Sequence, residues 1–312
     1  MNCLILGGAG FIGSNLTDAL LKLGHHVRVF DRLNVNTSNL TTALPRIELI
    51  RGDFLNDSDI ACALKDIELV VHLISTTLPK SSNDNPIYDV ESNVVGTLKL
   101  LDLSRQQGVK KVVFLSSGGT VYGPSVACPI SETAATDPVC SYGISKLAIE
   151  KYLHLHHHMN NLDYVVLRVA NPFGERQNPG SGQGVITAFL WKLLQNEPIS
   201  IWGDGTVARD YIYISDLVSA ILAAIEKETC SKLFNIGSGV PCSLNELLSI
   251  MQGVTGRTPV IQYTPGRKLD VPVNFLDITR ARDEILWQPL VSLEDGIART
   301  WTWLQHHKSD FE

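Results

Sequence analysis

The chain has 312 residues, of which 44% are hydrophobic and 19% are charged, and its formal net charge is -6. This length predicts about two domains. The negative charge argues against a general nucleic-acid or membrane-surface binder, because both functions need a basic face. The N-terminal segment lacks a basic region, and the longest apolar stretch, residues 217–225, is too short to span a bilayer. We therefore expect a cytoplasmic protein with no nucleic-acid or membrane partner.

The cysteines and histidines give no metal-binding pattern. Six cysteines are scattered without a CxxC pair, which favours reduced thiols over disulfides or zinc ligands. His154 and His158 are four residues apart, but they have no evident carboxylate or cysteine partner. Histidines near the end of a helix also interact favourably with its dipole. We expect no metal site.

Short apolar runs alternate with helical patterns over the first 170 residues. The predicted strands are Cys3–Leu6, His26–Phe30, Ile47–Arg51, Leu69–Leu73, Lys111–Leu115 and Tyr164–Arg168. The predicted helices are Ile12–Leu23, Ser58–Leu64, Asn93–Gln107 and Tyr142–His158. Strands that are apolar throughout are buried on both faces, and intervening helices imply right-handed crossovers between parallel strands. The pattern predicts an α/β fold with a Rossmann-type, doubly wound parallel sheet.

This alternation changes after Asn171, where glycine and proline become frequent up to Gly184. A helix follows, and later segments read as a turn and strand (203–213), a helix (216–227), a strand (234–236) and helices at 244–252 and 293–305. We predict that residues 1–170 and 209–240 form the first domain. Residues 171–208 and 241–312 are expected to form a smaller C-terminal α/β domain.

A glycine-rich loop joins the first predicted strand to the first helix. Gly7, Gly10 and Gly13 are spaced so that one can make a tight turn, one can admit a pyrophosphate and one can allow close helix packing. The phosphates would meet the free N–H groups and the positive end of the helix at Phe11 and Ile12. Glycine is also the default turn residue, but the strand before and the helix after are what this motif requires. The loop predicts a dinucleotide site.

An acidic residue indicates which dinucleotide is bound. Asp31 ends the second predicted strand, 18 residues beyond Gly13, where a carboxylate can accept a hydrogen bond from the ribose 2′-hydroxyl. The same carboxylate would repel a 2′-phosphate. Arg32, next to it, could accommodate that phosphate. We expect NAD as the cofactor.

Tyr142 and Lys146 lie at positions i and i+4 of a predicted helix, so they share one face. A phenol with a pKa near 10 is a poor base at neutral pH. A nearby ammonium and the positive charge of oxidised nicotinamide would both lower that pKa. Such pairs are common on surface helices, but this one follows a cofactor loop and a serine-rich strand end. It predicts hydride transfer from a carbon whose hydroxyl loses its proton to Tyr142.

Further motifs extend this pattern along nearly the whole chain. They include residues 52–54, 72–75, 93–97, 116–123, 168–174, 203–206 and 209–213. With them the chain resembles the extended short-chain dehydrogenases/reductases, and specifically the NAD-dependent nucleotide-sugar epimerases of the UDP-glucose 4-epimerase type. The resemblance implies a UDP-sugar substrate and a homodimer formed through the helices predicted at 93–107 and 142–158.

The resemblance also assigns residues to the two ligands. It adds Asp53, Phe54, Leu73, Ser75, Asn93, Ser116, Ala170, Tyr142 and Lys146 to the cofactor site. It assigns Ser117, Tyr142, Asn171, Val185, Trp202, Arg209, Arg267, Asp270 and Asn274 to the substrate site. In the family the two arginines hold the diphosphate and the tryptophan lines the uridine pocket. A few guanidinium groups can bind phosphates in this way without a basic surface.

One position departs from the family pattern. The catalytic serine or threonine usually lies four residues before the tyrosine of V-Y-G, and Gly118 occupies that position. Ser117 or Thr120 must then supply the hydroxyl, and the sequence does not choose between them. The family's 4,6-dehydratases need an Asp-Glu pair here and its decarboxylating members need a Glu. Gly118 and Gly119 provide neither, so the expected reaction is 4-epimerisation through a transient 4-keto sugar.

The sequence leaves the sugar open. A size-determining position of the family corresponds to Asn274, and smaller residues there admit N-acetyl sugars. UDP-glucose/UDP-galactose and a UDP-N-acetylhexosamine are therefore both candidates, and so is a UDP-uronate. Two other classes stay as alternatives: an NAD-dependent nucleotide-sugar oxidoreductase, which would release NADH, and a non-catalytic NAD-sensing regulator.

Overall fold

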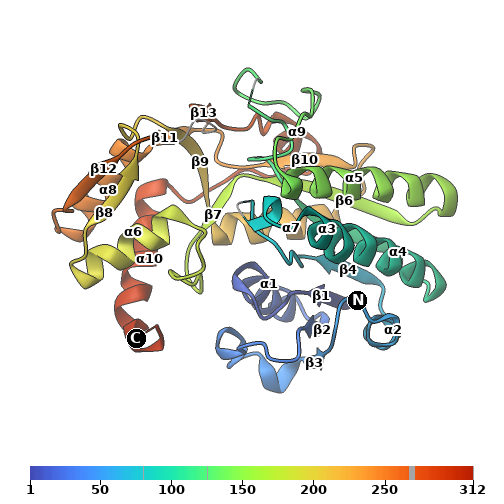
Figure 1. The fold of residues 1–312 in the computed structure, drawn as a ribbon. Coiled ribbons are helices and arrows are strands. Elements are labelled where there is room, and N and C mark those ends of the chain that lie inside the picture. Colours follow the sequence, from blue (N-terminus) through green and yellow to red (C-terminus); the bar gives the residue numbers. More distant parts are fainter. Residues whose placement is uncertain (80, 125, 267–270, 312) are drawn as a thin grey trace.

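A computed structural model describes residues 1–79, 81–124, 126–266 and 271–311. Seven parallel strands form the central sheet in the order β10-β6-β5-β4-β1-β2-β3 (Figure 1). The strands are β1 (Asn2–Leu6), β2 (His26–Asp31), β3 (Glu48–Arg51), β4 (Leu69–His72), β5 (Lys111–Ser117), β6 (Asp163–Val169) and β10 (Leu233–Ile236). All the strands predicted for this sheet are present, with ends that shift by one or two residues. The Rossmann-type parallel sheet is confirmed.

Helices cover both faces of this sheet. One face packs against α1 (Phe11–Lys22) and α7 (Ile214–Glu226), and the other against α2 (Asp57–Leu64), α4 (Gly96–Gln106) and α5 (Ser141–Asn160). The alternation of side chains along each strand separates the two cores. In β1, Cys3 and Ile5 face α1 and α7, whereas Leu4 and Leu6 face the opposite layer. The two layers of helices make the fold doubly wound.

The connection between β4 and α4 differs from the prediction. It contains a short 3-10 helix η3 (Ser81–Asn83), the single turn α3 (Pro86–Asp89) and a π-helical turn η4 (Val90–Val95). The regular helix therefore begins at Gly96, three residues later than predicted. A Cβ atom at Gly96 would lie 2.7 Å from the ring of Phe54, so only glycine allows this close approach. Wide π-turns of this kind are frequent near functional sites.

The rest of the chain builds a smaller unit beside the sheet (left in Figure 1). Its strands are β7 (Asn171–Phe173), β8 (Ile199–Trp202), β9 (Ala208–Tyr213), β11 (Pro241–Ser243), β12 (Ile261–Thr264) and β13 (Val273–Asn274). Its helices are α6 (Val185–Gln195), α8 (Leu244–Thr255) and α10 (Leu293–His306), whereas α9 (Thr279–Glu284) lies beside β10 of the central sheet. β11, β13 and β7 all pair with β9, and β8 pairs with β12. The predicted domain boundaries stay a prediction, and β9, inside the predicted range 209–240, joins the smaller sheet.

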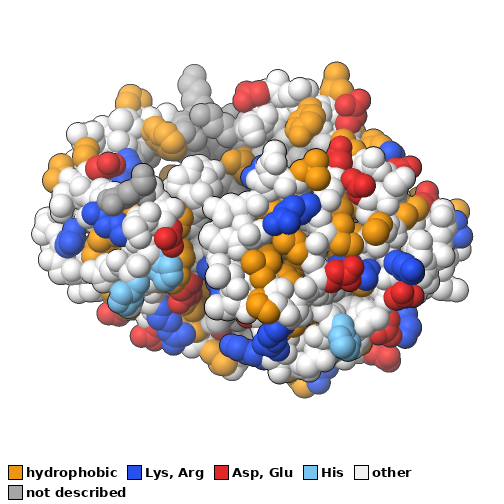
Figure 2. All heavy atoms as spheres, turned by 90° about the horizontal axis from the view of Figure 1, so that it is seen from below, with side chains coloured by type: hydrophobic (Ala, Val, Ile, Leu, Met, Phe, Trp, Pro, Cys, Tyr) orange, Lys and Arg blue, Asp and Glu red, His pale blue; other side chains and the backbone are white. Residues whose placement is uncertain are grey.

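Positively and negatively charged side chains are mixed on the visible surface. On the face shown in Figure 2, lysine and arginine side chains are interspersed with aspartate and glutamate rather than gathered in one field. Within the described ranges, no helix has the length and apolar character needed to cross a membrane.

Candidate active site

The glycine loop closes tightly between β1 and α1. Gly7 has a φ of +82°, a conformation that side chains disfavour. A Cβ atom at Gly13 would lie 2.5 Å from the Gly7 carbonyl oxygen, so the helix can approach the loop only because this residue is glycine. Gly10, at the start of α1, has no side chain to cap the first N–H groups of the helix. The loop thus fits a phosphate group at the helix end.

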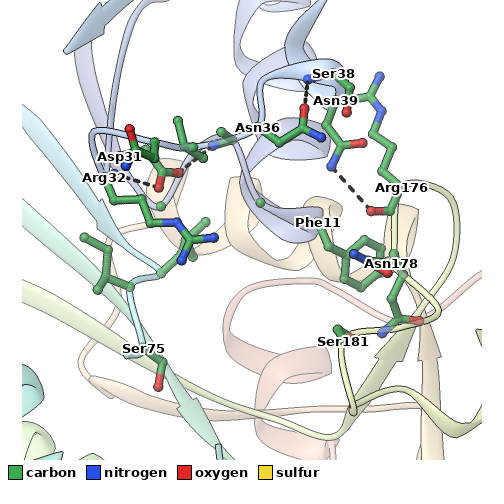
Figure 3. Close-up of a pocket in the computed structure, with 18 of the residues that line it drawn as sticks. Phe11, Asp31, Arg32, Asn36, Ser38, Asn39, Ser75, Arg176, Asn178 and Ser181 are labelled. Carbon is green, nitrogen blue, oxygen red and sulfur yellow. Dashed lines mark hydrogen bonds between the residues drawn. The ribbon is translucent and has the colours of Figure 1, made fainter. Parts of the chain in front are cut away.

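A cleft of about 1660 Å³ extends from this loop along the edge of the sheet (Figure 3). Asp31 and Arg32 lie on one side of the cleft, and Arg176 lies across from them. Asp31 accepts hydrogen bonds from the backbone N–H of Ala9 (3.1 Å) and from that of Arg32 (2.9 Å). These bonds fix the carboxylate at the end of β2, next to the glycine loop. Its position suits the predicted contact with an adenosine ribose.

Several other predicted cofactor residues line the same cleft. They are Gly7, Gly10, Phe11, Asp53, Phe54, Leu73 and Ser75. Asn93 and Ser116 instead use their side chains within the protein. The Asn93 carboxamide accepts from the backbone N–H of Thr76 (3.0 Å) and donates to Asp89, and the Ser116 hydroxyl donates to Glu150. Asn93 therefore anchors the loop after β4, and its direct contact with the cofactor stays a prediction.

Tyr142 and Lys146 lie in the first two turns of α5. The Lys146 Nζ atom is 5.6 Å from the centre of the Tyr142 ring and 4.7 Å from that of Phe114. It donates a hydrogen bond to the carbonyl oxygen of Leu115 (3.0 Å), and only 6% of the lysine is exposed. The ammonium group is therefore held next to β5 and near the ring of Tyr142.

The end of β5 explains the unusual glycine at position 118. A Cβ atom at Gly118 would lie 2.6 Å from a methyl carbon of Leu276, so the leucine occupies the space that a serine side chain would need. Ser117 ends β5 with its side chain partly exposed. The Thr120 hydroxyl is buried, and no hydrogen-bond partner for it occurs in the part of the chain that the structure describes. The catalytic role of either hydroxyl stays a prediction.

Three of the predicted substrate residues lie on β9 or on strands paired with it. Arg209 donates hydrogen bonds to the carbonyl oxygens of Ala208 (2.8 Å) and Val271 (2.7 Å). Asn274 is opposite Arg209 in the β13–β9 pairing and is only 3% exposed. Asn171 donates to the carbonyl oxygen of Asp210 (2.8 Å).

The remaining predicted substrate residues are more dispersed. Trp202 ends β8 and is half exposed, and Val185 begins α6. Arg267 and Asp270 lie outside the described residues.

Comparisons with known proteins agree with this geometry. The model of the NAD dependent epimerase/dehydratase family matches residues 3–237. The chain belongs to this family. A UDP-glucose 4-epimerase of Mycolicibacterium smegmatis is 38% identical over 305 residues, covering 96% of this chain and 97% of that protein.

Two solved structures are similar over nearly the whole chain. A UDP-glucose 4-epimerase from Thermotoga maritima with UDP-glucose has a TM-score of 0.93 and 37% identity, covering 99% of this chain and 100% of that one. A UDP-N-acetylglucosamine 4-epimerase from Methanobrevibacter ruminantium, in complex with UDP-N-acetylmuramic acid, has a TM-score of 0.92 and 30% identity, covering 98% of both chains. The cofactor of this epimerase/dehydratase family member is NAD.

Burial dominates the electrostatics of the catalytic pair. Burial raises the pKa of Tyr142 to about 12, and the neighbouring Cys140 and Asp89 add to the rise. Burial also lowers the pKa of Lys146 to about 8, although Asp89 and Glu150 oppose this shift. In the protein's own groups, desolvation of the phenolate is the largest effect on the Tyr142 pKa, and the predicted lowering by Lys146 and the nicotinamide stays a prediction. The Lys146 ammonium and an oxidised nicotinamide, when bound, would both oppose this rise.

A buried ion pair supports α5 from below. Glu150, one turn after Lys146, accepts two hydrogen bonds from Arg168 on β6 at 3.0 and 2.6 Å. The two side chains are 6% and 3% exposed. Removing either partner would leave an uncompensated buried charge, which is strongly destabilising. The pair therefore fixes α5, which carries Tyr142 and Lys146, against β6.

Sequence reasoning missed the polar residues that complete the cofactor cleft. They are Asn36, Ser38 and Asn39 after β2, and Arg176, Asn178 and Ser181 after β7 (Figure 3). Arg176 has a φ of +71°, rare for a residue other than glycine, and its guanidinium donates to Asp18 (2.6 Å). The run of short polar residues at 36–39, a few positions after Asp31, was an available signal, but such residues also mark ordinary turns.

Proposed function

We propose that this protein catalyses the NAD-dependent 4-epimerisation of a UDP-sugar through a transient 4-keto intermediate. One arrangement carries the proposal: Tyr142 and Lys146 stand on α5 beside the end of β5, where Gly118 and Gly119 offer no acid. A dehydratase or decarboxylase of this family would need a carboxyl group at that strand end. The names of the similar proteins, which include UDP-glucose and UDP-N-acetylglucosamine 4-epimerases, support the same reaction class.

The proposed mechanism uses Tyr142 as the base and then as the acid. As phenolate it accepts the proton of the sugar 4-hydroxyl, and it returns that proton after the keto sugar has turned over in its pocket. Bound NAD supplies the acceptor and the donor of the C4 hydride. Arg209 and Arg267 hold the diphosphate while the sugar turns. Lys146 stays protonated below pH 8 and adds a positive charge near the phenolate.

This mechanism makes the phenolate depend on the cofactor. Because burial raises the pKa of Tyr142 to about 12, the tyrosine is a weak base in its protein environment alone. The positive charge of oxidised nicotinamide favours phenolate, and this charge disappears once the hydride has been transferred. Without that charge Tyr142 would hold its proton while the keto sugar turns over, and restoration of the charge would favour release of the proton to the sugar oxygen. The basicity of Tyr142 would thus depend on the oxidation state of NAD.

The substrate of the proposed reaction is a UDP-hexose or a UDP-N-acetylhexosamine, with a UDP-uronate as the third candidate. Asn274 lies beside Arg209 on paired strands. The residue predicted to limit the size of the sugar is thus next to an arginine predicted to bind the diphosphate. An asparagine leaves more room there than a tyrosine. The structure of a relative with UDP-N-acetylmuramic acid supports including N-acetyl sugars in the test.

The decisive experiment incubates the protein with UDP-glucose, UDP-galactose, the corresponding N-acetyl sugars and UDP-glucuronate. The 4-epimer ratio is read by NMR, and absorbance at the NADH band is followed during turnover. We expect epimerisation of at least one substrate without net NADH release. Tyr142→Phe is expected to abolish turnover and to retain bound NAD. Sustained NADH release would favour the oxidoreductase alternative, and near-wild-type epimerisation by Tyr142→Phe would overturn the assignment of the base.

The third catalytic hydroxyl is tested on the substrate found in this way. Ser117→Ala and Thr120→Val each remove one candidate and change little volume. We expect one of them to lower kcat at least about tenfold, because it loses a hydrogen bond to the reacting oxygen. If both variants keep the wild-type kcat, neither hydroxyl has this role.

We also propose that the active protein is a homodimer. Apolar side chains are exposed along one face of α5, where Ile144, Leu155 and Met159 are 53%, 43% and 68% exposed. Ile87 on α3 is 72% exposed and extends the apolar surface. Such a surface is typical of a protein interface. Sedimentation velocity should show a dimer for the wild type and a monomer for Leu155→Glu, and a wild-type monomer would overturn the proposal.

A further inference from the structure

The helix that carries Tyr142 has no N-terminal cap of its own. Cys140 is the N-cap residue of α5, and its side chain accepts no hydrogen bond from the helix. Serine, threonine, aspartate or asparagine normally fills this position, because the first N–H groups of a helix lack partners within it. Tyr142 is the second residue of this 20-residue helix, so its placement depends directly on how the first turn is held.

The missing cap is supplied by a distant segment. The Asn83 side-chain oxygen accepts from the backbone N–H of Ser141 (2.9 Å), and the Ser82 hydroxyl oxygen accepts from the backbone N–H of Tyr142 itself (3.0 Å). These residues precede their partners by 58 and 60 positions and belong to η3. Ser82 is fully buried. The N–H of the proposed catalytic residue is thus fixed by a buried side chain from the connection between β4 and α4.

A buried carboxylate holds the same turn from its side. Asp89, at the end of α3, is fully buried and accepts from the hydroxyls of Ser141 (2.8 Å) and Ser145 (2.6 Å). Its other oxygen accepts from Asn93 (3.0 Å) and from the hydroxyl of Thr77. All four of these donors are neutral. Asp89 therefore joins the loop that continues from the cofactor cleft to the residues on either side of Tyr142.

We propose that Ser82, Asn83 and Asp89 are positioning residues that set the place of Tyr142 relative to the cofactor cleft. This inference rests on the proposed function of Tyr142. Thr76 lines the cleft, and both it and Thr77 bond to the same Asn93–Asp89 cluster. The connection between β4 and α4 thus lines the cofactor cleft at Thr76 and also holds the first turn of α5, which carries Tyr142. Because proton and hydride transfer need near-ideal geometry, a displacement of about 1 Å can lower a rate by up to about a hundredfold.

Asp89 also influences the charges at the site. The titratable groups that shift the pKa values of the catalytic pair are Cys140, Asp89 and Glu150, and the charge of Lys146 in turn helps to lower the pKa of buried His72. The Asp89 carboxylate raises the pKa of Tyr142 and that of Lys146. Removing its charge should therefore move the acid limb of the kcat–pH profile to lower pH. The neutral caps Ser82 and Asn83 should change kcat without this displacement.

The experiment compares Ser82→Ala, Asn83→Ala and Asp89→Asn with the wild type, using the UDP-sugar that the wild type epimerises. We expect Ser82→Ala and Asn83→Ala to lower kcat by about ten- to a hundredfold and to change KM less than about twofold, because the UDP-binding residues lie in the other unit. Asp89→Asn should displace the acid limb to lower pH. Asn83→Asp keeps an acceptor at the cap and should restore most of the lost kcat.

A matched control separates positioning from simple loss of stability. Ser292 caps α10, where its hydroxyl accepts from the backbone N–H of Asp295 (3.0 Å), far from the site along the chain. Ser292→Ala should lower the Tm to a similar degree as Ser82→Ala and leave kcat unchanged. Equal kcat losses in both variants, or an unchanged kcat in Ser82→Ala and Asn83→Ala, would overturn the inference.

A second readout does not depend on activity. Hydrogen exchange of the Tyr142 amide should be at least about tenfold faster in Ser82→Ala than in the wild type, because the amide has lost its acceptor. If the wild type epimerises no UDP-sugar, the proposed function fails and this measurement still tests the cap. If the wild type is active and the exchange rate is unchanged, the positioning inference alone fails.

Discussion

The N-termini of α1 and α5 differ in what lies next to their first backbone N–H groups. Neither helix is capped by its own N-cap residue, because α1 follows Gly10 and α5 follows Cys140. At α1 the glycine loop leaves the first turn directed at the cofactor cleft. At α5 the side chains of Asn83 and Ser82 already occupy the first N–H groups.

This difference shows how one structural element can serve two purposes. A helix N-terminus with unoccupied donors is suited to bind an anion, and the glycines of α1 allow a phosphate to come close. A helix N-terminus whose donors are occupied by the protein cannot bind an anion there. It is instead fixed in place, as a helix carrying a general base requires. We therefore expect changes at α1 to act on NAD binding and changes at α5 to act on the catalytic step.

The largest effect on the protein is expected from Gly13→Ala, which changes the N-terminus of α1. The added Cβ atom would lie 2.5 Å from both the Gly7 carbonyl oxygen and the Gly8 Cα atom, so the backbone must move. Overpacking of this kind costs about 1–3 kcal/mol and would distort the phosphate-binding loop. We expect purified Gly13→Ala to contain no NAD and to show no activity.

The matched control is Gly253→Ala in the exposed part of α8. No atom lies within 4 Å of a Cβ atom added there, and alanine favours a helix over glycine by about 1 kcal/mol. This variant should keep its NAD and have an equal or higher Tm. NAD retained at the wild-type level in Gly13→Ala would show that close packing at this glycine is not required for the cofactor.

A pH-dependent effect on stability is expected at α5. Lys146 is buried and its pKa is about 8, against 10.5 as the ordinary value. Between these two values the unfolded chain binds more protons than the folded one, so the free energy of unfolding rises with pH. Relative to Lys146→Met, which cannot titrate, the wild type should gain up to about 3 kcal/mol between pH 8 and pH 10.5.

Urea unfolding of both proteins at several pH values measures this difference. Relative to the wild type, the free energy of unfolding of Lys146→Met should be highest at low pH. There the wild type holds a buried charge that lowers its stability. The gap should move steadily in favour of the wild type as pH rises. A difference independent of pH would mean that the ammonium is better solvated than its burial implies.

The sequence predicted the fold and the cofactor loop because both depend on local patterns. Apolar strands, the glycine spacing and the Tyr142–Lys146 pair can be recognised within short segments. Contacts between distant segments could not be derived in this way. Leu276 fills the space beside Gly118, and Ser82 caps α5, but no local pattern links either residue to its partner. The raised pKa of Tyr142 in the protein alone could not be derived for a related reason, since the degree of burial depends on the complete fold.

The smallest effect, and the sharpest comparison of the two helix ends, is expected from Cys140→Ser. A serine at the N-cap can accept a hydrogen bond from the second or third N–H group of the helix, and the second belongs to Tyr142. In the wild type Ser82 already occupies that group, so Cys140→Ser alone should change the free energy of unfolding by less than about 0.5 kcal/mol. In the Ser82→Ala background the same substitution should restore about 1 kcal/mol, since the new hydroxyl replaces the lost acceptor. Equal effects of Cys140→Ser in both backgrounds would mean that Ser82 does not cap α5. In that case Asn83 alone would cap the N-terminus of α5.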